Sequence, residues 1–122
     1  MKKTILTFFI LSAVLSSSLA QGPKNYSESD DTIEVDSGED FLISLEANQV
    51  TGLRWELAEP LNWEMLSLIK IEYVPGFARF QGRGGKEIWT LKAISPGKTV
   101  ISLRYPGKKK VFMVTIKEMK AP

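Results

Sequence analysis

The sequence contains neither cysteine nor histidine, and these absences remove much of the common chemistry of proteins. Without them the chain can build no disulfide, thiol nucleophile, Cys/His zinc site or Ser-His-Asp triad. Carboxylates remain, but the acid pairs Asp30-Asp31 and Glu39-Asp40 lack the spacing of a calcium loop. A small carboxylate enzyme would need two acids that converge in a cleft, and no spacing here supports one. We therefore expect no metal, no cofactor and no enzyme.

The chain also lacks an apolar run that would span a bilayer comfortably. Its longest run, Ile5 to Leu15, follows the basic start Met1-Lys2-Lys3 and precedes the small residues of Ser18-Leu19-Ala20. This is the layout of a secretory signal peptide with cleavage after Ala20. The alternative is an uncleaved anchor, which the short run disfavours. We expect residues 1–20 to be a signal peptide and the mature protein to be secreted or periplasmic, with no membrane contact.

Length and composition indicate one globular domain. The 122 residues are 43% hydrophobic and 25% charged, which is ordinary for a folded protein. Removal of the signal peptide leaves roughly 100 residues, near the usual size of a domain that buries its own core. The polar stretch 21–31 is expected to be a flexible leader, and residues 32–122 to form the domain. We expect a monomer.

Charge is distributed unevenly along the chain. Ten acidic residues and one basic residue, Arg54, lie between Glu28 and Glu59, whereas twelve basic and four acidic residues follow Pro60. One interpretation is a basic face for nucleic acid or for an acidic partner. The other is that the two halves interleave in the fold and neutralise each other, which we favour. Export also argues against nucleic acid as a partner.

Apolar and polar residues alternate in short segments separated by turns rich in proline and glycine. The segments are 32–36, 41–47, 53–57, 66–74, 87–94, 99–105 and 111–117. Their inward positions include Phe41, Ile43 and Leu45, then Trp55, and then Trp89 and Leu91, whereas Ile69, Ile71 and Tyr73 share one side of 66–74. No segment has a sustained helical period. The pattern predicts an all-β protein, an immunoglobulin-like antiparallel β-sandwich of about seven strands.

Three polar turns stand out, and each has an ordinary structural explanation. Asn48 to Trp55 is consistent with a hairpin turn that ends in a core tryptophan. Gly82-Arg83-Gly84-Gly85 is either a flexible hairpin or a loop whose backbone lies flat against a partner. It is not a phosphate cradle, because a strand-like segment rather than a helix follows. Lys108-Lys109-Lys110 is either a solvated hairpin end or a charged contact.

Taken together, these turns make the chain resemble the chagasin family of cysteine peptidase inhibitors. The family's first loop reads N-P-T-T-G, an aromatic residue, any residue and Trp, and here Asn48, Thr51, Gly52 and Trp55 match. Its second loop reads G-x-G-G before a strand with an aromatic, matched by Gly82, Gly84, Gly85 and Trp89. Its third carries R-P-W, and Leu103-Arg104-Tyr105-Pro106-Gly107 occupies that place. Gln49, Val50 and Leu53 depart from the pattern, and the third-loop tryptophan is missing.

The resemblance implies a reversible, competitive inhibitor of papain-like cysteine peptidases. Three loops would block the active-site cleft: the first loop (48–53), the second loop (82–86) and the third loop (104–110). The first would sit over the catalytic thiol, the second along the cleft wall, and the third would brace the other side. The alternative is an exported immunoglobulin-like module that binds another protein or a cell-surface component and has no peptidase target. The expected peptidase-binding residues are Asn48, Gln49, Val50, Thr51, Gly52, Leu53, Gly82, Arg83, Gly84, Gly85, Arg104, Tyr105 and Pro106.

Overall fold

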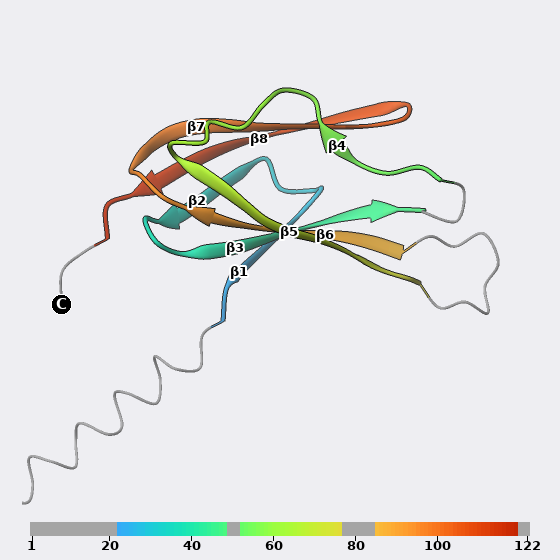
Figure 1. The fold of residues 1–122 in the computed structure, drawn as a ribbon, viewed down its shortest axis with the longest axis horizontal. Helices are drawn as coiled ribbons and strands as arrows, with labels where there is room; N and C mark the ends of the chain where they lie inside the picture. The colour runs from blue at the N-terminus through green and yellow to red at the C-terminus, as the bar shows by residue number, and fades with distance from the viewer. Residues whose placement is uncertain (1–21, 49–51, 77–84, 120–122) are drawn as a thin grey trace, which may run out of the picture.

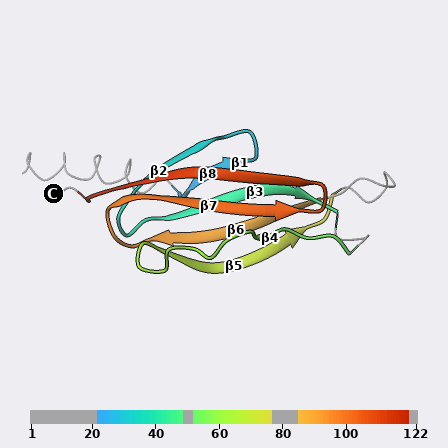
Figure 2. The ribbon, with the colours of Figure 1, turned by 90° about the horizontal axis from the view of Figure 1, so that it is seen from above.

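The computed structural model describes residues 22–48, 52–76 and 85–119, which contain eight strands and no helix. Two four-stranded sheets, in the orders β1-β3-β6-β5 and β2-β8-β7-β4, pack face to face. Figures 1 and 2 show these layers from two directions. The predicted all-β, immunoglobulin-like sandwich is confirmed. The strands are β1 (Lys24–Ser27), β2 (Thr32–Asp36), β3 (Asp40–Ala47), β4 (Glu56–Leu57), β5 (Leu66–Val74), β6 (Gly85–Ala93), β7 (Gly97–Tyr105) and β8 (Lys108–Lys117).

The sheets are mixed rather than purely antiparallel, because β1 and β2 each add a parallel edge strand. β1 pairs with β3, and β2 pairs with β8 in the other sheet. β1 lies inside the segment 21–31, for which the sequence predicts a flexible leader, so the structure differs from that expectation at residues 24–27. The sequence pattern does not indicate this strand, because most of its side chains are polar. One of them, Tyr26, nevertheless packs edge-on against Phe41, with ring centroids 6.3 Å apart.

The core lies between the two sheets and contains the side chains that the alternating pattern places inward. Ile43 of β3 pairs with Trp89 of β6, and both are buried. Trp55 is also buried, but it precedes β4, so the predicted strand 53–57 shrinks to two residues. The fully or almost fully buried apolar residues are Ile33, Val35, Phe41, Ile43, Leu45, Ala47, Trp55, Leu61, Leu66, Trp89, Leu91, Ala93, Ile101, Leu103, Phe112, Val114 and Ile116.

A β-bulge in β5 overturns part of the predicted pattern. The register between β5 and β6 shifts between Leu68 and Lys70, which leaves Ile69 as the extra residue. Ile69 is therefore 46% exposed and does not share a face with Ile71 and Tyr73. Strict alternation along 66–74 predicts one face for Ile69, Ile71 and Tyr73. It fails here because a bulge moves a side chain to the other face without any signal in the composition.

Ion pairs between the acidic and basic halves of the chain confirm that the two halves interleave. Nζ atoms of Lys108 and Lys110, in β8, lie 3.0 and 2.9 Å from carboxylate oxygens of Glu28 and Asp31. Three further pairs join the halves in the same way: Asp40–Lys92, Glu56–Arg104 and Glu34–Lys117. Five of the twelve basic residues after Pro60 thus lie beside acidic residues of the first half, which weakens the argument for a basic face.

The described part of the chain shows no helix long and apolar enough to cross a membrane. Within the same ranges, acidic side chains form no group of three or more that could hold a metal ion.

Candidate functional site

The residues that flank the three predicted loops come together at one end of the sandwich. Ala47, the last residue of β3, pairs with Gly85, the first residue of β6. The backbone N–H of Asn48 donates to the hydroxyl of Tyr105, the last residue of β7, at 3.0 Å. In Figure 1 these strand ends and the β7–β8 turn all lie at the right-hand end of the molecule. The fold therefore gathers segments that are more than 50 residues apart in the sequence.

The first loop returns to the core abruptly. Gly52 has a φ of +86°, a conformation that side chains disfavour, and nothing lies near the place where its Cβ would be. Leu53 is 37% exposed and Arg54 is exposed, but Trp55 is only 3% exposed. Three residues thus carry the chain from solvent to the core, and Trp55 fixes where the loop ends.

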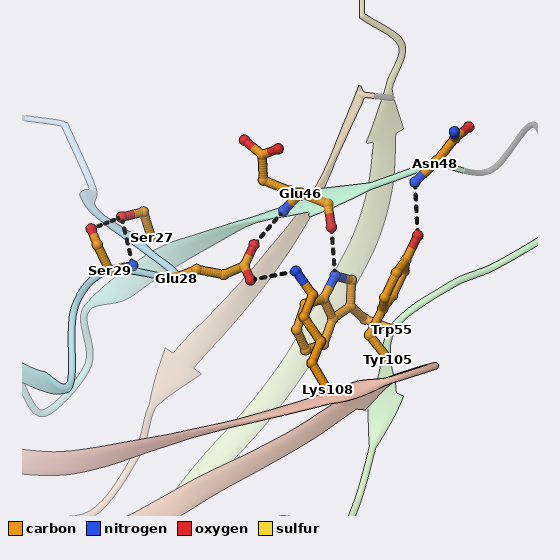
Figure 3. Close-up of polar contacts among 8 residues, drawn as sticks. All are labelled: Ser27, Glu28, Ser29, Glu46, Asn48, Trp55, Tyr105 and Lys108. Atoms are coloured by element: carbon orange, nitrogen blue, oxygen red, sulfur yellow. Dashed lines mark hydrogen bonds and ion pairs between the residues drawn. The ribbon is translucent and has the colours of Figure 1, made fainter. Parts of the chain in front are cut away.

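Trp55 is held on three sides. Its indole Nε1 donates to the carbonyl oxygen of Glu46 at 2.9 Å, and its backbone N–H donates to Oε2 of Glu87 at 3.1 Å. Its ring lies 5.1 Å from the ring of Tyr105, centroid to centroid, at a tilt of 33°. Figure 3 shows the tryptophan between β3 and the third loop. One side chain therefore ties the end of the first loop to its start and to the third loop.

Glu87 is a completely buried carboxylate that contacts the end of the first loop at Trp55. Its Oε1 accepts from the indole N–H of Trp89 at 3.1 Å, while Oε2 accepts from the backbone of Trp55. Because buried carboxylates are tolerated only when hydrogen bonds replace their hydration, these two donors keep Glu87 in the core. Glu87 lies two residues after Gly85, so it links the base of the second loop to the end of the first.

Gly85 is needed because backbone from the end of β5 passes directly over it. A Cβ at this position would lie 2.0 Å from the carbonyl oxygen of Val74 and 2.8 Å from the backbone nitrogen of Gly76. No side chain fits at such distances. The absence of a side chain at Gly85 therefore serves the chain's own packing, whereas its sequence motif suggested contact with a partner.

The third loop is a tight hairpin whose tyrosine turns inward. Pro106 and Gly107 connect the paired residues Tyr105 and Lys108, and Gly107 has a φ of +88°. Proline followed by such a glycine is typical of a type II turn. The Nζ of Lys108 lies 5.3 Å from the ring centroid of Trp55 and 5.5 Å from that of Tyr105. Arg104 is exposed and lies 3.5 Å from Glu56, measured from Nη2 to Oε1.

The structure describes seven of the thirteen predicted site residues, and all seven lie at the end of the sandwich where β3 ends and β6 begins. Six fall outside the described residues: Gln49, Val50, Thr51, Gly82, Arg83 and Gly84. Sequence reasoning missed Glu87, although it lies in the same alternating phase as Trp89 and Leu91, which is a readable signal for an inward side chain. It also missed Glu28, whose partner Lys108 is 80 residues away and which no local pattern marks.

Comparison with known structures agrees with the fold. The structure is similar to the cysteine protease inhibitor EhICP2 from Entamoeba histolytica, with a TM-score of 0.65 and 20% identity over 79% of this chain and 96% of that one. It is also similar to Amebosin, with a TM-score of 0.59 and 24% identity over 81% of this chain and all of that one. No curated protein sequence matches the chain.

The model of one protein family, described as "Chagasin family peptidase inhibitor I42", matches residues 34–116, which is more than half of the chain. The match includes β3 to β7 in full and the three loops. Members of this family are peptidase inhibitors, so the prediction of a peptidase inhibitor rather than an enzyme is confirmed. The chain belongs to the chagasin family of peptidase inhibitors.

Proposed function

We propose that this inhibitor blocks the active-site cleft of its peptidase with the end of the sandwich that carries the first, second and third loops. The observation that supports the proposal is the convergence of Asn48, Gly85 and Tyr105 at that end. The inhibition is competitive, because the inhibitor would occupy the substrate's place in the cleft, and reversible, as the resemblance to the chagasin family implies. Binding would rest on a surface shaped to fit the cleft.

Preorganisation is what the described residues contribute to such a surface. Ordering a loop on binding costs free energy, and a loop already fixed in the free protein avoids part of that cost. Trp55 and Gly52 fix the end of the first loop, and the bond to Tyr105 fixes its start. The tip of the loop, with Thr51, would then meet the catalytic thiol of the enzyme. The second loop would lie along the cleft wall.

We also propose that the inhibitor acts outside the cytoplasm. The basic start, apolar run and small residues of 1–20 support export. Detection of the mature chain in the periplasm or medium, with Gln21 as its first residue, would test this. A chain that keeps Met1 and is found in the cytoplasmic fraction would contradict export.

A titration of papain and of a cathepsin with residues 21–122 tests the inhibitory function. The peptidase is assayed with a fluorogenic peptide at several substrate concentrations. We expect KM to rise with inhibitor while kcat stays constant, and dilution to restore activity. Trypsin serves as the control, since it has a serine nucleophile and a differently shaped cleft. Full papain and cathepsin activity at micromolar inhibitor would contradict the proposal for these enzymes.

A further inference from the structure

Within the described ranges, no strand pairs with the last residues of β3 on the side of β1. β1 pairs with β3 only from Phe41 to Ser44, whereas β3 continues to Ala47 and then enters the first loop. Past Ser44, the edge that faces β1 has no strand to receive its backbone groups. Unpaired edge groups would leave the start of the loop free to move.

Three side chains take the place of the missing strand. Oε1 of Glu28 accepts the N–H of Glu46 at 2.9 Å, and the indole of Trp55 donates to the carbonyl of the same residue. The hydroxyl of Tyr105 accepts the N–H of Asn48. Figure 3 shows these contacts in sequence along β3. The edge groups of residues 46 and 48 are thus occupied up to the point where the first loop begins.

Glu28 connects this arrangement to the rest of the site. Its Oε2 lies 3.0 Å from Nζ of Lys108, and that ammonium lies over the rings of Trp55 and Tyr105. The turn that carries Glu28 is held by its own bonds, since the N–H of Ser27 donates to Asp30 at 2.9 Å and the N–H of Asp30 donates back to the carbonyl of Ser27 at 3.0 Å. A turn held by its own bonds therefore carries the carboxylate that accepts the N–H of Glu46 and pairs with Lys108.

We propose that Glu28 is a positioning residue for the first loop, an inference that rests on the proposed function of that loop. It acts through Glu46, Trp55 and Tyr105 and holds the start of the loop in its binding geometry. By this proposal Glu28, which lies in a stretch that resembles a leader in the sequence, is part of the inhibitory apparatus.

Asp31 provides a matched control within the same turn. It also forms an ion pair with a lysine of β8, Lys110, at 2.9 Å. This pair touches neither Glu46 nor the ring of Trp55, and Lys110 instead lies over Phe112. Loss of either carboxylate removes one bond between the β1–β2 turn and β8. Only loss of Glu28 also frees the edge of β3.

The first experiment needs no peptidase and measures amide hydrogen exchange in residues 21–122. Glu28→Ala is expected to speed exchange at the amides of Glu46 and Asn48 about tenfold, because their protection depends on Glu28 and on the tyrosine it helps to order. Asp31→Ala should leave both rates unchanged. Equal rates at these two amides in both variants and in the wild type would overturn the proposal, whatever the inhibitor's target proves to be.

The second experiment measures the inhibition constant of the same proteins against papain. Glu28→Ala should weaken inhibition about tenfold, and Asp31→Ala less than twofold. Glu28→Gln keeps an acceptor for the N–H of Glu46 and should recover part of the loss, which a general loss of stability would not explain. Equal inhibition by Glu28→Ala and Asp31→Ala would overturn the proposal. If the wild type fails to inhibit papain, the exchange experiment still decides the role of Glu28.

Discussion

The backbone N–H of Trp55 donates to the buried carboxylate of Glu87 across 32 positions of sequence, at 3.1 Å. This bond joins the end of the first loop to β6, the strand that begins where the second loop ends. The same carboxylate accepts the indole N–H of Trp89, so two tryptophans, one in β6 and one just before β4, bond to one acid. In a sandwich without cysteine, this contact connects the sheets where many related folds use a disulfide.

Glu87→Gln should destabilise the protein by about 1–3 kcal/mol. A glutamine of the same shape offers one acceptor oxygen, and its NH₂ group faces a donor, so one of the two N–H groups loses its partner. Denaturation in guanidinium, followed by tryptophan fluorescence, measures the change. Glu72→Gln is the control, because Glu72 is exposed on β5 and its pair with Lys70 lies in solvent. A loss below 0.5 kcal/mol at Glu87, as expected for a surface substitution, would contradict the assigned role.

Gly85→Ala should cost about 1–3 kcal/mol, because the new methyl group would collide with backbone atoms of Val74 and Gly76 that cannot move without shifting β5. Thermal unfolding measures this loss. Gly22→Ala is the control, since nothing lies within 4 Å of its added Cβ and its φ is ordinary. An unchanged melting temperature for Gly85→Ala would show that the end of β5 shifts at little cost, which would contradict the packing role assigned to Gly85. Because Gly85 is needed for packing, Gly84→Glu is the cleaner probe of the second loop's contact with an enzyme.

Tyr105→Phe should weaken inhibition about three- to tenfold while it lowers stability by about 1 kcal/mol. The ring remains against Trp55, and only the acceptor for the N–H of Asn48 is lost. Tyr26→Phe is the control, because it also removes one hydroxyl. That hydroxyl donates to the carbonyl of Glu34 at 2.9 Å, and this bond involves none of the three loops. Inhibition assays and unfolding curves on both variants separate the effects. An equal loss of inhibition in both would indicate a general effect of stability.

Thr51→Arg should weaken inhibition about a hundredfold, as expected if a bulky side chain is placed at the centre of a contact. The melting temperature should stay nearly constant, since the substitution removes no buried group assigned above. Lys98→Glu, an exposed change at the opposite end of β7, provides the control and should inhibit like the wild type. Unchanged inhibition by Thr51→Arg would remove the first loop from the contact surface.

The sandwich was predictable because its signals are local. Alternation in residues such as Phe41, Ile43 and Leu45 assigned β3 within one residue, and Pro106-Gly107 marked the β7–β8 turn. β1 was not predictable in this way, because its four polar residues bury little and owe their strand to pairing with β3. The bulge at Ile69 was hidden for the same reason, since it arises from register with β6 rather than from composition.

The turns at Gly52 and Gly107 were predictable, because glycine is the residue that adopts the positive φ these positions require. The contacts that support the loops were not, because each joins distant positions. Lys108 illustrates the difference, since the sequence indicates an exposed basic hairpin, whereas the structure turns this lysine over Trp55 and toward Glu28. Lys108 and Lys109 are both exposed, and no sequence pattern distinguishes the lysine that makes these contacts from its neighbour.

The close backbone approach of residues 74–76 to Gly85 marks a place where new sequence could be inserted. β5 ends at Val74 and β6 begins at Gly85, and the close approach of Gly85 to residues 74–76 involves backbone atoms. New sequence inserted between Gly76 and Gly85 would leave the pairing of β5 with β6 in place, and doubling the length of a loop costs only about 0.6 kcal/mol in closure entropy. A library of inserts at this position would therefore be a direct way to redirect the inhibitor toward other peptidases.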